Sequence, residues 1–237
     1  MPYGTHGNAA RAEVIRLASR VLSEERVARF EAAAAARTNA VVPVLEGLYD
    51  EGNIAAVCRS AEALGFHSVH TVDVCPKSKL SARAQSSAAS GAAKWLHRER
   101  WASTAECIAG LKEDGYRVVV THLSRETVPI GELDWTTPTA VLFGNEREGA
   151  SDEAVELADA CVAIPMDGLV ESFNVSVAAA LALYHARQDR LARQGANGDL
   201  SEEQQRALVA HFCLRHDASF PAVLRNLLER ERKAAPQ

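Results

Sequence analysis

Apolar and polar positions along the middle of the chain follow two alternating periodicities. Short runs rich in Val, Ile and Leu are typical of buried strands, and between them apolar residues recur three or four positions apart, as in amphipathic helices. This alternation of strand and helix predicts an α/β fold with a parallel sheet covered by helices on both faces. The predicted strands are residues 40–48, 68–74, 94–101, 116–123, 139–145 and 161–166, and the predicted helices are 53–66, 104–115, 151–158 and 173–193.

Helical patterns also occupy both ends of the chain. Residues 8–37 combine strong helix formers with apolar positions at helical spacing, and they serve either in packing and dimerisation or in RNA contact. After a Gly/Asn-rich linker, two more helices are predicted. We therefore expect a helical N-terminal extension over 1–37, a central domain over 38–194 and a helical C-terminal extension over 195–237.

Composition narrows the class of protein. The 237 residues are 47% hydrophobic, which suits one sizeable core, and no apolar run approaches the roughly 20 residues of a membrane helix. The N-terminal stretch lacks the apolar segment of a secretion signal, so we expect a cytoplasmic protein without membrane contact, with an organellar location left open. The five cysteines and eight histidines are scattered without metal-ligand spacing, so we expect no metal site.

Charge is unevenly distributed along the chain. The net charge is −5, which argues against a general polyanion binder. Residues 1–37 carry 6 basic and 4 acidic side chains and residues 187–237 carry 9 and 7, so the ends sum to +4 and the middle to −9. A basic loop still interrupts this acidic middle, with Lys77, Lys79 and Arg83. It is either a solvated loop or a set of RNA phosphate contacts.

Candidate chemistry lies where predicted strands end, because ligands of open parallel sheets bind at the carboxyl ends of strands. Each candidate also has a plain structural interpretation. Residues 142–149 read as a turn, Asn53 as a helix N-cap, Arg59 as a surface charge, and Ser172 with Asn174 as a cap of the following helix. The glycine-rich signatures of dinucleotide-binding and nucleotide triphosphatase loops are absent, which argues against those classes.

Taken together and in chain order, three stretches carry a pattern that none carries alone. They read N-x-x-x-x-x-R at 53–59, L-F-G-N-E-x-E-G at 142–149 and I-P-M-x-G-x-x-x-S-F-N-V-S-x-A at 164–178. This combination resembles the three motifs of the SpoU (TrmH) family of RNA ribose 2′-O-methyltransferases, over roughly residues 40–190. It is most similar to the TrmH subgroup, which methylates guanosine 18 of tRNA.

The resemblance implies a fold that periodicity alone does not predict. Members of the family are trefoil-knotted α/β proteins of the SPOUT type, work as homodimers and bind S-adenosylmethionine in the knot. It also implies the cofactor-contacting residues of this chain. Thr121 would line the pocket, and the other contacts would come from Leu142, Gly144, Ile164, Met166 and Phe173.

The resemblance also assigns roles to the polar residues of the motifs. Arg59 matches the family's catalytic arginine, and its guanidinium would hold the neighbouring phosphate and either act as base or position the ribose hydroxyl. Asn53 would position Arg59 or the ribose, and Glu146 would hold its loop or contact the partner subunit's site. Ser172 and Asn174 would stand near cofactor and ribose.

Two positions depart from the family pattern. Ala55 stands where a Gly or Ser is usual, and Phe173 stands where a Leu is common. Neither change touches a polar residue of the motifs. The larger ring of Phe173 would tighten or reshape the adenine slot.

The substrate stays open among three possibilities. We favour tRNA guanosine 18, because enzymes of the wobble position are usually shorter and many ribosomal RNA enzymes carry an additional N-terminal domain. The alternatives are methylation of ribosomal RNA or of the tRNA wobble position, and a knotted protein that binds RNA without catalysis. The joint presence of Arg59, Glu146, Ser172 and Asn174 argues against the last.

Overall fold

The computed structural model describes residues 8–73, 91–123 and 126–234. The chain divides into two compact units, which we treat separately: a sheet unit of residues 38–197 and a terminal unit built from residues 1–37 and 198–237. The two helical extensions predicted at opposite ends of the chain thus belong to the same unit.

The sheet unit has a parallel sheet, as predicted. Among the described residues seven strands pair in the order β3-β2-β1-β6-β4-β7-β5, and every neighbouring pair is parallel. The strands are β1 (Val41–Glu46), β2 (Ser68–Val72), β3 (His97–Trp101), β4 (Arg117–Thr121), β5 (Val128–Pro129), β6 (Thr139–Phe143) and β7 (Ala160–Ala163). The helices of this unit are α3 (Glu51–Ala63), α5 (Thr104–Glu113), α6 (Asp152–Leu157) and α7 (Val175–Gln194), with short 3-10 turns at η2 (Ala93–Trp95) and η3 (Ile130–Glu132).

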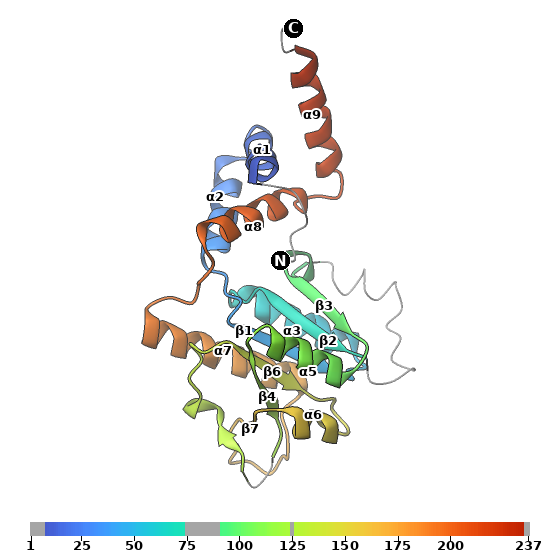
Figure 1. The fold of residues 1–237 in the computed structure, drawn as a ribbon, viewed down its shortest axis with the longest axis vertical. Coiled ribbons are helices and arrows are strands. Elements are labelled where there is room, and N and C mark those ends of the chain that lie inside the picture. Colours follow the sequence, from blue (N-terminus) through green and yellow to red (C-terminus); the bar gives the residue numbers. More distant parts are fainter. Residues whose placement is uncertain (1–7, 74–90, 124–125, 235–237) are drawn as a thin grey trace. The chain divides into compact units, whose positions relative to one another are not determined.

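Helices cover both faces of this sheet (Figure 1). The side chains of β1 show why, because they are buried on both sides of the strand. Val41 and Leu45 belong to an apolar cluster with residues of α3 and α7. Val42 and Val44 point the other way, into a second cluster with residues of α5 and α6. Successive side chains of a strand point to opposite faces of the sheet, and both faces are covered here. Nearly every position of β1 is therefore apolar.

Several boundaries differ from the sequence-based expectations. β7 ends at Ala163, so residues 164–166 belong to the following loop and not to the strand. Residues 94–95 lie in a 3-10 turn before β3. The two-residue strand β5 has no periodicity to reveal it, and the sequence missed it. The predicted threading of the chain into a trefoil knot stays a prediction.

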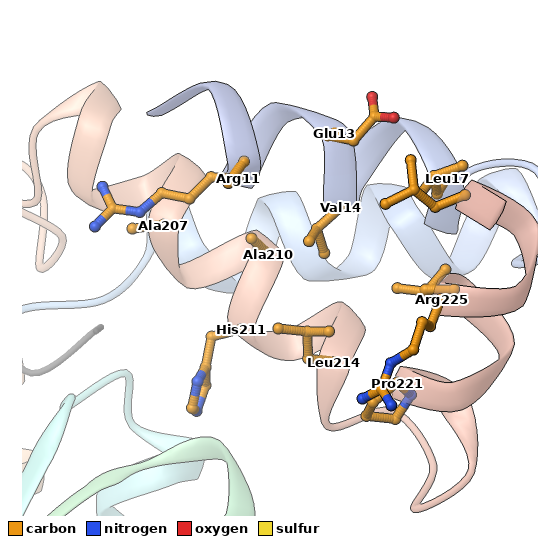
Figure 2. Close-up of a pocket in the computed structure, with 13 residues that line it drawn as sticks. Arg11, Glu13, Val14, Leu17, Ala207, Ala210, His211, Leu214, Pro221 and Arg225 are labelled. Carbon is orange, nitrogen blue, oxygen red and sulfur yellow. The ribbon is translucent and has the colours of Figure 1, made fainter. Parts of the chain in front are cut away.

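The terminal unit is a helical assembly of its own. It contains α1 (Asn8–Ala18), α2 (Glu24–Ala35), α8 (Glu202–Leu214) and α9 (Phe220–Ala234). Phe30 of α2 packs against Phe212 of α8 with ring centroids 5.8 Å apart, and Glu231 of α9 pairs with Arg16 of α1 and with Arg20, which lies in the turn after that helix. A mainly apolar cavity of about 930 Å³ opens between α1, α8 and α9, with residues such as Val14, Ala210 and Leu214 on its wall (Figure 2).

Candidate active site

The carboxyl ends of the central strands form one edge of the sheet. Register aligns Leu45 of β1 with Phe143 of β6, and Leu142 of β6 with Val120 of β4. The loops that follow these strands therefore leave the sheet at the same edge. All three motif stretches begin at or beside this edge, as expected for a ligand site of a parallel sheet.

The loop after β6, residues 144–150, is held in a compact shape by its own backbone. Asn145 and Gly149 exchange two backbone hydrogen bonds of 3.1 Å, and the Asn145 side chain accepts from the amides of Arg147 and Glu148 at 2.8 and 2.9 Å. A Cβ on Gly144 would lie 2.0 to 2.2 Å from the backbone of Gly149 and Ala150. The loop backbone therefore approaches Gly144 so closely that no side chain fits at this position.

Three polar side chains from the three motifs meet beside this loop. The Asn53 amide nitrogen donates to Glu146 Oε1, and the Asn174 amide nitrogen donates to Asn53 Oδ1 at 3.2 Å. Asn53 lies in the first turn of α3, Glu146 in the loop after β6, and Asn174 at the start of α7. Up to 121 positions of sequence separate these partners. Each motif thus contributes one member of a single hydrogen-bonded set.

The structure contradicts one of the predicted capping roles and confirms another. Asn53 is not the N-cap of α3. That cap is Asp50, which accepts from the Gly52 amide at 2.7 Å, so Asn53 is left free to bond across the site. Asn174 does cap α7, and its Oδ1 accepts from the amide and hydroxyl of Ser176 at 2.9 and 2.6 Å. α7 accordingly begins at Val175 and not at Phe173.

Arg59 and Ser172 lie outside this hydrogen-bonded set. Both side chains are exposed, and neither makes a hydrogen bond or ion pair within the described part of the chain. Arg59 follows Asn53 by six residues, and at about 3.6 residues per turn that places it on a different side of α3. The structure of one chain thus brings Asn53, Glu146 and Asn174 together and leaves Arg59 facing solvent.

The predicted cofactor residues cluster at the same edge of the sheet. Thr121 ends β4, and its hydroxyl donates to the Leu142 carbonyl at 3.1 Å. Leu142 is fully buried, its backbone included. Ile164 and Met166 are half-buried in the loop after β7.

The loop between β7 and α7 also carries exposed apolar side chains. Phe173 is 38% exposed, Val170 is 67% exposed and Leu169 is fully exposed. Apolar walls with nearby backbone donors and acceptors suit a flat heteroaromatic ring.

The predicted RNA-contacting residues Lys77, Lys79 and Arg83 lie outside the described residues. In the parts of the chain that are described, no cluster of three or more His, Cys, Asp or Glu side chains is arranged to hold a metal ion. None of the described helices has the length and apolar character needed to span a membrane.

One buried group at this edge was missed from the sequence. Glu46 is the last residue of β1 and is 2% exposed. Its carboxylate accepts hydrogen bonds from Thr104 and Ser151. A signal existed, since a glutamate ends a strand whose other positions are all apolar, but the pattern alone does not say which donors it meets.

Comparison with known proteins agrees with this architecture. Residues 40–184 match the model of the SpoU rRNA Methylase family. The tRNA (guanosine(18)-2′-O)-methyltransferase of Escherichia coli strain K12 is 38% identical over 169 residues, which cover 71% of this chain and 72% of that protein.

Solved structures give the same result. The TrmH/SpoU tRNA modifying enzyme of A. aeolicus has a TM-score of 0.68 at 29% identity, covering 80% of this chain and 96% of that one. The SpoU methyltransferase AviRb of Streptomyces viridochromogenes, solved with the cofactor AdoMet, has a TM-score of 0.54 at 28% identity, covering 66% of this chain and 62% of that one. With its motif residues hydrogen-bonded at one sheet edge and its family model matched over most of the sheet unit, this chain belongs to the SpoU methylase family.

Proposed function

We propose that this chain is an S-adenosylmethionine-dependent RNA ribose 2′-O-methyltransferase that acts on guanosine 18 of tRNA. The observation that carries the proposal is the hydrogen-bonded set of Asn53, Glu146 and Asn174, which unites the three family motifs. The E. coli relative named for the guanosine 18 reaction supports the choice of substrate, because it matches over 71% of this chain.

The cofactor site of the proposal is the edge formed by the ends of β6, β4 and β7. Its groups fit S-adenosylmethionine, because the half-buried Ile164 and Met166 offer apolar surface for adenine. Phe173 adds a partly exposed ring. With no side chain on Gly144, the 144–150 loop closes on its own backbone at Gly149 and Ala150, which fixes its shape beside this edge. When bound, the cofactor supplies an electrophilic methyl group on a sulfonium.

The residues of this chain would act on the ribose. Its 2′-hydroxyl is a poor nucleophile and must lose its proton as the oxygen attacks the methyl carbon. In the proposal the charged guanidinium of Arg59 binds the adjacent phosphate and orients the hydroxyl. It could take the hydroxyl proton only in its neutral form, because the protonated group has no acceptor. Asn53 and Asn174 fix the neighbouring groups, and Ser172 lies in the same segment.

RNA binding in the proposal relies on local positive charge. Lys77, Lys79 and Arg83 contact phosphates, and arginines of the terminal unit add to them. Because the chain as a whole is negative, at −5, we expect modest affinity that falls steeply with added salt. A tRNA substrate agrees with the cytoplasmic location of the proposal.

The functional assembly in the proposal is a homodimer. Of the ten large apolar side chains that are exposed among the described residues, six lie between residues 169 and 184. Val177, Leu181 and Tyr184 recur four and three positions apart, so they form one apolar stripe along α7, and each is 41% to 54% exposed. An apolar surface of this kind is typical of an interface. We propose that a second copy of the chain covers it.

The test of the reaction is methyl transfer from radiolabelled S-adenosylmethionine to an unmodified tRNA transcript, followed by mapping of the labelled ribose. We expect the label on guanosine 18 and none on a transcript with 2′-deoxyguanosine at that position. Label at the wobble position, or on ribosomal RNA only, would keep the reaction and replace the substrate. RNA binding without any transfer would overturn the enzymatic proposal.

A further inference from the structure

Glu46 forms a buried hydrogen-bonded link at the carboxyl end of β1. Its Oε1 accepts from the Thr104 hydroxyl at 2.5 Å and from the Ser151 hydroxyl at 2.7 Å, and its Oε2 accepts from the Ser151 amide at 2.9 Å. Thr104 is the first residue of α5, and Ser151 is the N-cap of α6. One carboxylate therefore connects the end of a central strand to the starts of two helices.

Burying the carboxylate of Glu46 costs free energy of desolvation. A carboxylate that is 2% exposed has lost its hydration, and no cation pairs with it in the described part of the chain. Three donors compensate the charge, but an apolar side chain would need no compensation, and replacing buried charges by apolar groups is often neutral or stabilising. Stability alone is therefore a weak reason for a glutamate here.

The position of Ser151 suggests what the link does. Ser151 directly follows the 144–150 loop, and its hydroxyl also accepts from the Ala154 amide at 3.1 Å as the cap of α6. β6 fixes the other end of this loop at Phe143. Gly144 packs against the backbone of Gly149 and Ala150, and Ala150 directly precedes Ser151. Fixing the position of Ser151 therefore also fixes the backbone contacts that close the loop.

We propose that Glu46 is a positioning residue for methyl transfer. By fixing Ser151 it sets the conformation of the 144–150 loop, and thereby the meeting of Glu146 with Asn53 and the backbone surface offered to the cofactor. This role rests on the proposed function, because it names the loop of that same site. Glu46 itself is buried, so it acts through its hydrogen bonds to Ser151.

Two replacements of Glu46 separate this role from simple burial. In Glu46→Gln the amide oxygen can accept from the Ser151 amide while its nitrogen donates to the two hydroxyls, which are able to accept. Glu46→Leu has a similar size but leaves the Ser151 amide unpartnered. Glu46→Leu removes all three hydrogen bonds to the carboxylate, and we expect it to raise the KM for S-adenosylmethionine about tenfold or more. Glu46→Gln should stay within about threefold of wild type.

A pair of serines provides the matched control. Ser151→Ala removes the α6 cap and the hydroxyl bond to Glu46, whereas Ser103→Ala removes an equivalent cap on α5, where the Ser103 hydroxyl accepts from the Glu106 amide at 3.2 Å. Both changes lose one cap of similar strength. Only Ser151→Ala should raise the KM for the cofactor, so a simple loss of stability is distinguished from a loss of positioning.

The experiment measures kcat and the KM for S-adenosylmethionine, with tRNA as the methyl acceptor, and, separately, hydrogen exchange of the amides of residues 144–150. We expect faster exchange of this loop in Glu46→Leu and Ser151→Ala, and wild-type exchange in Ser103→Ala and Glu46→Gln. Equal loop exchange and equal KM in the two serine variants would overturn the inference. If Glu46→Leu does not fold, the comparison of Ser151→Ala with Ser103→Ala and the result for Glu46→Gln still test the inference. Absence of methyl transfer by the wild type would instead overturn the proposed function, while the exchange result would still test the link.

Discussion

Asn53 shows how much of the site depends on one amide group. Its nitrogen donates to Glu146 and its oxygen accepts from Asn174, so a single side chain with both a donor and an acceptor bridges two motifs. A carboxylate could not donate and an ammonium could not accept. The residue type is therefore explained by its two partners, and helix capping is left to Asp50.

Arg59 is the residue on which the proposed chemistry depends most. Its exposed guanidinium has no partner within the described residues, so removing it should not destabilise the fold. We expect Arg59→Gln to lower kcat about 100-fold or more and to leave the affinity for S-adenosylmethionine unchanged. Single-turnover methyl transfer and calorimetry measure the two quantities. Arg59→Lys, which keeps the charge without the planar fork, should retain part of the rate, and normal turnover in Arg59→Gln would remove this residue from the mechanism.

His70 makes stability depend on pH. Burial lowers the pKa of this ring to about 4 from 6.5, against a raising effect of Glu99 and Asp114 and with a further lowering by His97. The unfolded chain then binds more protons between these values, so the free energy of unfolding should fall as pH falls from about 6.5 to 4, by about 3 kcal/mol in total. Urea unfolding across this range measures the slope. His70→Gln should flatten it, and an unchanged slope in that variant would assign the effect to other groups.

Helix ends and loops are the elements that carry the site. α7 begins at Asn174 because this side chain caps it, and the same side chain also reaches Asn53. The 144–150 loop returns on itself through Gly149, whose φ of 74° suits glycine, and Gly144, where any Cβ would meet backbone. The start of one helix and one tight loop therefore hold the polar set in place.

Separating the two tasks of Asn174 tests this arrangement. Asn174→Asp keeps the oxygen that accepts from Ser176 but loses the donor to Asn53 Oδ1. We expect a thermal midpoint close to that of wild type and a kcat/KM about tenfold lower. The control is Ser201→Ala, which removes a capping box from α8 and should lower stability without changing kcat/KM. A large stability loss in Asn174→Asp with normal kcat/KM per folded molecule would contradict the assignment.

A glycine pair tests the shape of the loop. A Cβ on Gly144 would lie 2.0 Å from the Gly149 backbone, whereas a Cβ on Gly131, which lies outside the three motifs, would have only the His185 ring within 4 Å, at 3.9 Å. We expect Gly144→Ala to weaken binding of S-adenosylmethionine about tenfold or more by displacing the loop, and Gly131→Ala to bind normally. Calorimetry on both variants gives the comparison. Equal affinity in the two would show that the loop shape does not matter for the cofactor.

At the scale of the whole molecule, the sheet unit presents its exposed apolar side chains mainly along one segment. α7 buries Ala179, Leu183 and Ala186 against the sheet and exposes Leu181 and Tyr184 on its other side. A helix that is apolar on both sides in this way needs a second partner. This is the physical basis for expecting a dimer.

The dimer is tested by a matched pair of charge insertions. Leu181 on α7 is 41% exposed and Leu157 on α6 is 39% exposed. We expect wild type and Leu157→Asp to have twice the 25.5 kDa chain mass in light scattering, and Leu181→Asp to shift toward the monomer because a carboxylate would be buried in the interface. A wild type that stays monomeric at all concentrations would contradict the dimer.

The sequence by itself determined the class of fold and supplied the candidate residues of the proposed site. Strand and helix periodicities are local properties, so the alternation from β1 to α7 could be predicted from them. The motifs gave the polar residues Asn53, Glu146 and Asn174, because residue type and order are visible without coordinates. Boundaries were less certain, since caps such as Asp50 compete with neighbours of similar propensity.

Only the tertiary structure decided which of these residues meet. The order of strands places the loops after β1, β6 and β7 at one edge, and so brings Asn174 to Asn53 while leaving Arg59 outside. It also buried Glu46 beneath the loop and joined the two ends of the chain in one helical unit. These are contacts between residues distant in sequence. Local patterns carry no information about them, because they depend on how the whole sheet pairs and packs.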